Sequence, residues 1–272
     1  METMRPPAVA GSFYDADPSA LRAGVEGYLD EARRPSAGAA PKAVIVPHAG
    51  YVYSAPVAAR AYAAVAALAG LVRRVVLLGP AHFVPFRGIA APAADAFVTP
   101  LGTLPVDRPA VDSLSDLDQV IVDDAPHQQE HSLEVQLPFI QVVLGQVAIV
   151  PLVVGSARAD EVAEVLEKVW GSGDTLIVIS SDLSHYLGYE TARHRDTATA
   201  AAIEALEASR LGPEDACGCL AIGGLLVVAR RCGLRPTRLD LRNSGDTAGP
   251  MDHVVGYGAW AFHPAEAGGA SA

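Results

Sequence analysis

The chain has 272 residues, of which 50% are hydrophobic and 19% are charged, a balance that predicts a soluble globular protein with a large core. Its formal net charge of −11 argues against nucleic acids and anionic membranes as partners, because both are bound by clustered lysine and arginine. Three cysteines are too few for a disulfide framework, and the N-terminus lacks the regions of a signal peptide, so we expect a cytoplasmic location. No apolar run approaches the ~20 residues that cross a bilayer.

The first part of the chain predicts an arm followed by a helix. Residues 6–14 are aromatic and are punctuated by proline and glycine, which is typical of an ordered arm packed on the body. Residues 21–32 carry leucine and valine four residues apart, which predicts an amphipathic helix. Asp17 or Ser19 is placed to cap that helix.

A strand, a loop and a second helix come next. Residues 34–41 are a linker of small residues and proline, and a buried strand follows them. Ser54 and Pro56 then provide an N-cap and an early helical proline for a helix over residues 57–69. This completes the first β-loop-α unit.

The rest of the chain alternates strands with helices. The predicted elements are strand 73–78, a short β excursion at 88–105, helix 131–144, strand 148–155, helix 159–170, the strand that opens segment 175–186, helix 195–207, an apolar helix at 217–231, and strands 237–242 and 253–262 around a turn-rich segment at 243–250. Pro138 should kink or break its helix. We predict a single three-layer α/β/α domain over residues 1–264 with a mixed, largely parallel central sheet, and a disordered tail at residues 265–272.

Three apolar runs each deliver a histidine just past the last apolar residue. The runs AVIVPHAGY, VVLLGPAHF and TLIVISSDLSHY contain His48, His82 and His185. Open α/β sheets bind their ligands at the carboxyl ends of parallel strands, and His48 and His82 are about one βαβ repeat apart. Neutral imidazoles are common ligands of iron, zinc and copper. The pair His48 and His82 therefore predicts a site for a divalent metal.

The third ligand stays open on these grounds. Asp182, Glu130 and Glu134 are carboxylate candidates, and Cys217 is another because a thiolate at a helix N-terminus has a lowered pKa. Spacing alone favours a different interpretation, in which Cys217 and Cys219 are small buried hydrophobic residues.

Further polar residues near these strand ends are candidates for catalysis and substrate binding. Asp182 and His185 are close enough in sequence for one to orient the other, and His185 next to a metal is a candidate general base. Asp182 as the cap of a short helical turn is the structural alternative. His131, Tyr51 and Ser181 are predicted to contact the substrate, with core packing as the alternative for Tyr51.

Residues 126–132, PHQQEHS, place His127 and His131 where one helix face could bind a metal by itself. Pro126 favours a loop instead, in which His131 lines the site as a donor. The chain has no P-loop, no G-x-G-x-x-G and no G-x-S-x-G motif, which argues against nucleotide-dependent and serine-hydrolase chemistry.

Several motifs together resemble the MEMO family, called in prokaryotes the AmmeMemoRadiSam system protein B. They are PHAGYVYS at 47–54, LLGPAHF at 77–83, EHSLEVQLPF at 130–139, SSDLSHY at 180–186 and the CG pair that begins at Cys217. The resemblance runs from GSFY near the start to VVGYGAWAF near the end, and it implies a fold similar to LigB-type class III extradiol dioxygenases. It also implies that His48, His82 and Cys217 are the metal ligands, with Asp182 and His185 beside them.

The family differs from those dioxygenases by a cysteine in place of a glutamate ligand. A thiolate suits copper(I) or zinc better than a carboxylate does and changes the redox balance of iron, so the activity does not transfer with the fold. The leading prediction is a redox enzyme that uses iron(II), with copper or zinc as alternatives, on a small oxygenated or phenolic substrate whose proton His185 moves. The alternatives are a non-catalytic metal-binding or peptide-binding adaptor module and a metallohydrolase. The family name implies a pathway link to AMME-domain and radical SAM proteins.

Overall fold

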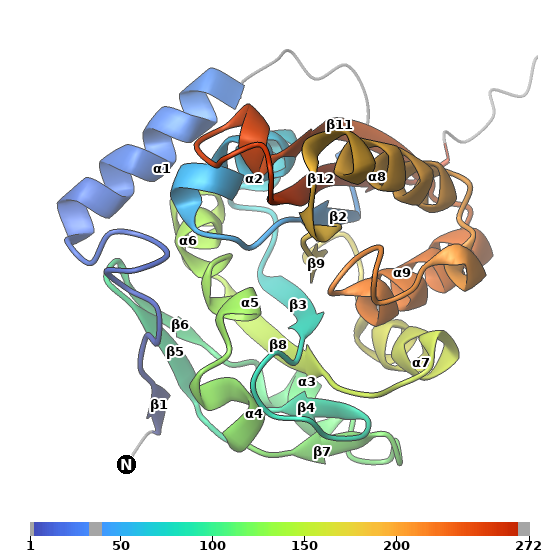
Figure 1. The fold of residues 1–272 in the computed structure, drawn as a ribbon. Coiled ribbons are helices and arrows are strands. Elements are labelled where there is room, and N and C mark those ends of the chain that lie inside the picture. The colour runs from blue at the N-terminus through green and yellow to red at the C-terminus, as the bar shows by residue number, and fades with distance from the viewer. Residues whose placement is uncertain (1–2, 33–39, 266–272) are drawn as a thin grey trace, which may run out of the picture.

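The structure is a computed structural model, and it describes residues 3–32 and 40–265. Of the predicted linker and tail, residues 34–39 and 266–272 lie outside the described residues. A mixed β-sheet lies between two layers of helices (Figure 1), which confirms the predicted three-layer α/β/α architecture. None of the helices in the described part of the chain is both long and apolar enough to cross a membrane.

The central sheet contains nine strands within the described residues, in the order β10-β12-β2-β9-β3-β8-β4-β7, with β11 paired to β12. Their bounds are β2 Ala43–Val46, β3 Arg74–Pro80, β4 Ile89–Ala91, β7 Val120–Val122, β8 Ala148–Val154, β9 Thr175–Ser180, β10 His185–Leu187, β11 Arg235–Asn243 and β12 Val254–His263. Strands β2, β9, β3 and β8 pair in parallel at the centre, whereas β12 joins β2 and β4 joins β8 in antiparallel fashion. The predicted mixed sheet is therefore parallel in its core and antiparallel towards both flanks.

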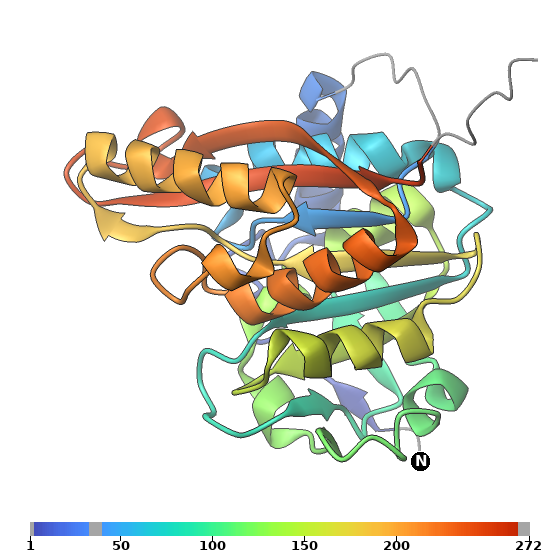
Figure 2. The same cartoon turned by 90° about the vertical axis from the view of Figure 1, so that its right-hand side faces the viewer.

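Helices cover both faces of this sheet. One layer contains α1 (Pro18–Ala32), α2 (Tyr51–Val65) and α6 (Leu137–Leu144), and the other contains α7 (Ala159–Val169), α8 (Tyr189–Glu204) and α9 (Cys219–Cys232). Figure 2 shows the second layer from its outer side. The short helices α3 (Arg108–Asp112), α4 (Ala125–Gln128) and α5 (His131–Glu134) lie in the connections, as do the 3-10 turns η1 (Ala66–Leu68), η2 (Ala208–Arg210) and η3 (Ser244–Asp246).

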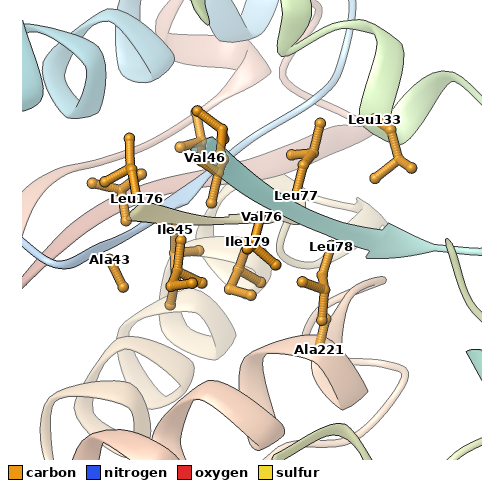
Figure 3. Close-up of a cluster of buried hydrophobic side chains, with 14 of the residues drawn as sticks. Ala43, Ile45, Val46, Val76, Leu77, Leu78, Leu133, Leu176, Ile179 and Ala221 are labelled. Atoms are coloured by element: carbon orange, nitrogen blue, oxygen red, sulfur yellow. The ribbon is translucent and has the colours of Figure 1, made fainter. Parts of the chain in front are cut away.

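The core lies around β2, β9 and β3. All residues of β2 and β9 are buried, which explains why their sequences are continuous apolar runs and not alternating patterns. Figure 3 shows side chains such as Ile45, Leu77 and Ile179 on these strands, with Ala221 of α9 approaching from below. These buried strands give the residues that follow them a rigid base.

The N-terminal arm has its own small sheet. Strand β1 (Met4–Arg5) pairs in parallel with β5 (Ala96–Thr99), which forms a hairpin with β6 (Gly102–Pro105). The predicted β excursion is thus confirmed as a hairpin. The predicted arm at residues 6–14 follows β1 and bonds instead to Glu134 through Ala8 N, Val9 N and Tyr14 Oη.

Some helix bounds differ from the predictions, and each difference has a local cause. Asp17 does cap α1, since its Oδ1 accepts a hydrogen bond from Ala20 N at 2.8 Å. Helix α2, however, begins at Tyr51 and not at residue 57, because Ser54 Oγ donates back to Ala49 O and does not act as the cap. Helix α8 likewise begins at Tyr189, after an extended Gly188, and not near residue 195.

The helix predicted over residues 131–144 is broken, as its proline suggested. It divides into α5 and α6, and Pro138 lies in the first turn of α6, where a missing N–H costs little. The break turns α5 towards the carboxyl edge of the sheet, and this places His131 at the site described next.

Candidate metal centre

Three candidate residues lie at equivalent positions on neighbouring strands. His48, His82 and Asp182 each come two residues after the end of β2, β3 and β9. These strands are adjacent and parallel, so their carboxyl ends meet at one edge of the sheet. The order of the strands thus brings three polar residues from distant parts of the sequence to one edge of the sheet.

Three histidines converge at this edge. The potential ligand atoms of His48, His82 and His131 all lie within 4.8 Å of one another. The ring centroids of His48 and His82 are 5.2 Å apart, and the centroid of His131 is 5.5 Å from that of His48 and 4.6 Å from that of His82. The structure therefore joins His131, predicted as a substrate-contacting donor, to the two predicted ligands.

The hydrogen bonds of His48 fix its tautomer. Ser180 Oγ donates to Ser132 O at 2.6 Å, so this hydroxyl can only accept from His48 Nδ1, 2.9 Å away. The proton of the neutral ring therefore lies on Nδ1 and the lone pair on Nε2. Burial, with His82 nearby, lowers the pKa of His48 to about 3, so the ring is neutral and available as a ligand.

Glu130 orients His82 in a similar way. Its Oε1 lies 2.8 Å from His82 Nδ1, its Oε2 accepts from the backbone N of His82 at 2.7 Å, and Oε1 also accepts from Ser132 N at 2.8 Å. Burial opposes the charge, but the hydrogen bonds from His82 and Ser132 lower the pKa of Glu130 to about 2. Glu130, a candidate third ligand, thus uses both oxygens to hold His82 with its Nε2 free.

His131 lies beside the same carboxylate, with its Nδ1 3.5 Å from Glu130 Oε1. Its Nδ1 is buried and has no hydrogen-bond partner among the described residues. Its ring packs against Phe13 of the N-terminal arm, with centroids 4.7 Å apart. Burial and the neighbouring His48 lower the pKa of His131 to about 4, which keeps the imidazole neutral. Neutral nitrogens with free lone pairs in a tight group fit a transition metal or zinc.

Cys217 lies beside the histidines, two residues before α9. Its Sγ is 3.3 Å from His48 Nε2 and accepts from Asp182 N at 3.3 Å. Gly218 makes this approach possible, because a Cβ there would lie 2.7 Å from the Cβ of Ser181. Burial raises the pKa of the thiol, so Cys217 is protonated in this structure.

Ser181 and Asp182 shape the loop between the strand and the site. Ser181 Oγ donates to Asp182 O at 2.7 Å and accepts from Gly218 N at 2.9 Å, and the residue is fully buried. Asp182 Oδ1 accepts from His48 N at 2.7 Å, and burial raises the pKa of this carboxyl. The structure therefore gives Ser181 a place behind Cys217, away from the cavity lining.

His185 is oriented by a backbone carbonyl. Its Nδ1 donates to Leu183 O at 2.8 Å, which leaves Nε2 unprotonated in the neutral ring. The Asp182 side chain accepts from His48 N, and no hydrogen bond joins it to His185 within the described residues, so an orienting role of Asp182 for His185 stays a prediction. Both side chains nevertheless line one cavity.

That cavity opens next to the histidines and has a volume of about 350 Å³. Its wall includes His131, Asp182 and His185, together with the rings of Phe13, Tyr53, Tyr186, His253 and Tyr257. Tyr51, predicted to contact the substrate, is buried instead with its hydroxyl donating to Val135 O at 2.8 Å, and Tyr53 faces the cavity in its place. A helical start at Tyr51 explains this, because residues two apart on a helix point in different directions.

Two contributions to the site were not foreseen from the sequence. Glu130 serves His82 and not the metal position, and His253 and Tyr257 line the cavity from β12 and the turn before it. For His253 and Tyr257, the sequence offered one indication, the turn-rich segment at 243–250 that precedes them. The partner of Glu130 lies 48 residues away and leaves no local pattern.

Comparison with known proteins places this geometry in a family. The chain is 36% identical to a MEMO1 family protein of Sulfolobus acidocaldarius, with 93% of this chain and 97% of the relative covered. It is 35% identical to a MEMO1 family protein of Aquifex aeolicus over the same shares, and 34% identical to one of Metallosphaera sedula over 95% and 99%. A crystal structure of an uncharacterized protein from Escherichia coli K12 covers 80% of this chain and 98% of its own at 15% identity, but its TM-score of 0.49 is too low to support an argument. The family model described as Memo-like protein matches residues 5–261, and the chain therefore belongs to the Memo-like protein family.

Proposed function

We propose that this protein is a metal-dependent redox enzyme whose substrate is a small oxygenated or phenolic molecule. One observation carries the proposal: His48 and His82 are both held through Nδ1, which leaves each Nε2 without the ring proton, and Cys217 Sγ lies 3.3 Å from His48 Nε2. His131, whose ring lies against both of these rings, lines the neighbouring aromatic cavity. His48, His82 and Cys217 are the proposed ligands of a divalent metal, with iron(II) favoured and copper or zinc as alternatives. When bound, iron(II) would supply Lewis-acid and one-electron redox chemistry at an oxygen atom of the substrate.

The chain's own residues would bind and deprotonate the substrate. The rings of Phe13 and Tyr53 give the cavity an apolar wall, and Phe13 packs against His131 in the same lining. His185 presents Nε2 to the same space, because its Nδ1 proton is engaged by Leu183 O. His185 is therefore the residue that would accept a hydroxyl proton from the substrate.

Metal analysis of protein purified without oxygen tests this function. Wild type should contain close to one metal per chain, and His48→Ala, His82→Ala and Cys217→Ala should each lose most of it, since each removes a ligand. His185→Ala should keep the metal, and it should lower any turnover by about 10²–10⁴-fold, as expected for a lost general base. Full metal content in the Cys217 variant, with loss in His131→Ala, would replace Cys217 by His131 in the ligand set. Metal-free wild type that also fails to take up iron(II), copper or zinc would reject the function.

A second function is favoured by the surface around the cavity. Tyr186, Phe83 and Met251 are 73%, 51% and 57% exposed, and large exposed apolar side chains near a pocket are typical of a contact with another protein. We therefore retain a non-catalytic adaptor that binds a peptide or a metal as the alternative. It predicts stoichiometric metal but no consumption of oxygen with any reductant or phenol tested.

We propose a cytoplasmic location because of the cysteine content, and a pathway shared with AMME-domain and radical SAM proteins because of the family name alone.

A further inference from the structure

Tyr186 has a backbone conformation that L-residues rarely adopt. Its φ is +58°, and it shares a positive φ with a single other non-glycine residue of the described chain, Leu206 at +55°. Leu206 is explained by its position, because it follows the C-cap of α8 and its N–H donates to Ile203 O, as is common where helices end. Tyr186 does not end a helix. It lies within strand β10, where the pairing with β12 shifts register between His185 and Leu187.

The strain at Tyr186 is not offset by packing. The residue is 73% exposed, the largest exposed fraction among the large hydrophobic side chains of the described chain. Its hydroxyl makes no hydrogen bond within the described residues. Asparagine or glycine would fit this conformation at lower cost. A strained, exposed and unbonded aromatic residue therefore contributes nothing to the fold that a smaller residue could not supply.

The position of the ring relates it to the cavity. Its centroid is 5.8 Å from that of His185, with the planes nearly perpendicular at 66°. Tyr186 lines the same cavity as Phe13, Tyr53 and Tyr257, so aromatic rings from four separate parts of the chain surround the space next to the histidines. The bulge in β10 turns the residue after His185 towards the cavity mouth and not into the strand pairing.

We propose that Tyr186 is a substrate-contacting residue that covers the cavity mouth and selects ligands with a planar aromatic ring. The inference rests on the proposed function, in which the oxygen atoms of the ligand reach the histidines. It adds that the part of the ligand near Tyr186 is an aromatic ring. The positive φ is kept because it presents the ring to the ligand.

Two metal-binding probes that differ in their aromatic ring test this proposal. The first is 4-nitrocatechol and the second is acetohydroxamate, which binds metals through two oxygens but has no ring. Each is titrated into the zinc-loaded protein, since zinc is redox-silent, and 4-nitrocatechol is also titrated into the zinc-free protein. The variants are Tyr186→Asn, which removes the ring and tolerates the backbone, and Tyr186→Phe, which keeps the ring.

If the ring contacts the ligand, removing it should lower the affinity for the aromatic probe and not for the probe without a ring. Tyr186→Asn should weaken 4-nitrocatechol binding about 3- to 10-fold, as expected for one lost aromatic contact, and should leave acetohydroxamate within about twofold. Tyr186→Phe should bind both probes as wild type does. The thermal midpoint of Tyr186→Asn should equal that of wild type or exceed it by about 2 °C, because the backbone strain is relieved. Leu206→Asn, the other positive-φ site, should leave the binding of both probes unchanged.

Several outcomes overturn the proposal. Equal effects of Tyr186→Asn on the two probes, or no effect on either, would each show that the ring does not select an aromatic ligand. A lowered thermal midpoint would show that the ring supports the fold and would overturn the argument from strain. Zinc-loaded wild type that binds acetohydroxamate but not 4-nitrocatechol would reject the inference and keep the metal function. Tyr186-dependent binding of 4-nitrocatechol by a protein that takes up no zinc would support the inference and reject that function.

Discussion

Glu130 and Ser180 each orient a histidine by accepting a hydrogen bond from its Nδ1, but the two bonds differ in strength. Each accepts the Nδ1 proton, but Ser180 is a neutral hydroxyl and Glu130 is a carboxylate with a lowered pKa. A carboxylate partner makes an imidazole more basic and holds its orientation more firmly. His82, at 27% side-chain exposure, is also the less enclosed of the two rings, so it depends more on this partner.

Glu130→Gln should therefore weaken metal binding without abolishing it. The amide oxygen can still accept from one N–H of His82, but the charge is lost, and we expect the Kd for iron(II) or zinc to rise about 10- to 100-fold. Competition with a metal chelator measures this constant. Glu164→Gln, the same change at an exposed position of α7, is the matched control. Unchanged affinity in Glu130→Gln would show that the carboxylate only caps α5.

The position of Cys217 beside the histidines leads to a prediction about its oxidation in air. A thiolate bound next to iron and oxygen is oxidised more readily than a carboxylate, so the iron(II)-loaded protein in air should show weak or no ring cleavage of simple catechols. Mass spectrometry should find oxidation at Cys217. Buried Cys219 and exposed Cys232 in the same sample are internal controls, since neither lies next to the histidines. Ring opening over many turnovers with Cys217 intact would make this protein a working dioxygenase.

The N-terminal arm is the element that connects the fold to the site. Arg5 forms a buried ion pair with Glu134 and donates to His127 O and Glu130 O at 2.9 and 2.6 Å. Glu134 also accepts from Ala8 N, Val9 N and Tyr14 Oη. Through these bonds the arm fixes the segment that carries Glu130 and His131, and it brings Phe13 against the ring of His131.

Breaking this buried pair should cost far more than breaking a pair on the surface. Arg5→Met leaves the Glu134 charge buried without its partner, and we expect a loss of about 3–5 kcal/mol in the free energy of unfolding. Arg231→Met removes exposed ion pairs to Glu167 and Asp160 and should cost at most about 1 kcal/mol. Urea denaturation compares the two variants. Similar losses would contradict the assignment of Arg5 as the anchor of the arm.

At the level of elements, strands were easier to predict than helix starts. The runs that became β2, β3 and β9 are apolar on both faces, and only a buried parallel strand accounts for that pattern. The starts of α2 and α8 were missed because Gly50 and Gly188 precede them without a side-chain cap, so no polar residue marks the first turn.

At the site, too, features with a local sequence pattern could be predicted and contacts between distant segments could not. A histidine after a buried strand is a local signal, and His48 and His82 could be singled out because strand periodicity predicted their neighbourhood. The partners of those histidines could not be assigned in this way. The bonds of His82 to Glu130 and of His48 to Cys217 depend on how distant segments pack, and one sequence does not encode such pairs in a spacing.

The whole molecule should be sensitive to acid because buried imidazoles resist protonation. Burial lowers the pKa of His127 to about 4, its Nε2 donates to Ala90 O at 3.0 Å, and its Nδ1 is buried without a partner among the described residues. In the unfolded chain a histidine titrates near ~6.5. Between about pH 6.5 and 4 the His127 imidazole is therefore protonated in the unfolded state and neutral in the folded state. Stability is retained above this window and falls as the pH falls through it.

For His127 alone, this linkage amounts to about 3 kcal/mol across the window. His127→Leu should flatten the dependence of unfolding free energy on pH between about pH 6.5 and 4, even though its stability at pH 7 falls with the lost bond to Ala90. Urea unfolding at several pH values gives that slope. His194→Leu, on the exposed side of α8, is the control and should leave the slope of wild type. An unchanged slope in His127→Leu would place the acid sensitivity elsewhere.

The pairing of strand β2 with strand β9 also decides when the metal site can come into existence. His48 and the residues that hold it are joined across 134 residues to Asp182 and across 169 residues to Cys217. During synthesis, a chain that emerges from the ribosome carries His48, His82 and His131 long before the last of these partners has been made. Contacts of such long range form late in folding. A metal ion held by the proposed ligands would therefore bind to the folded protein and not to the growing chain.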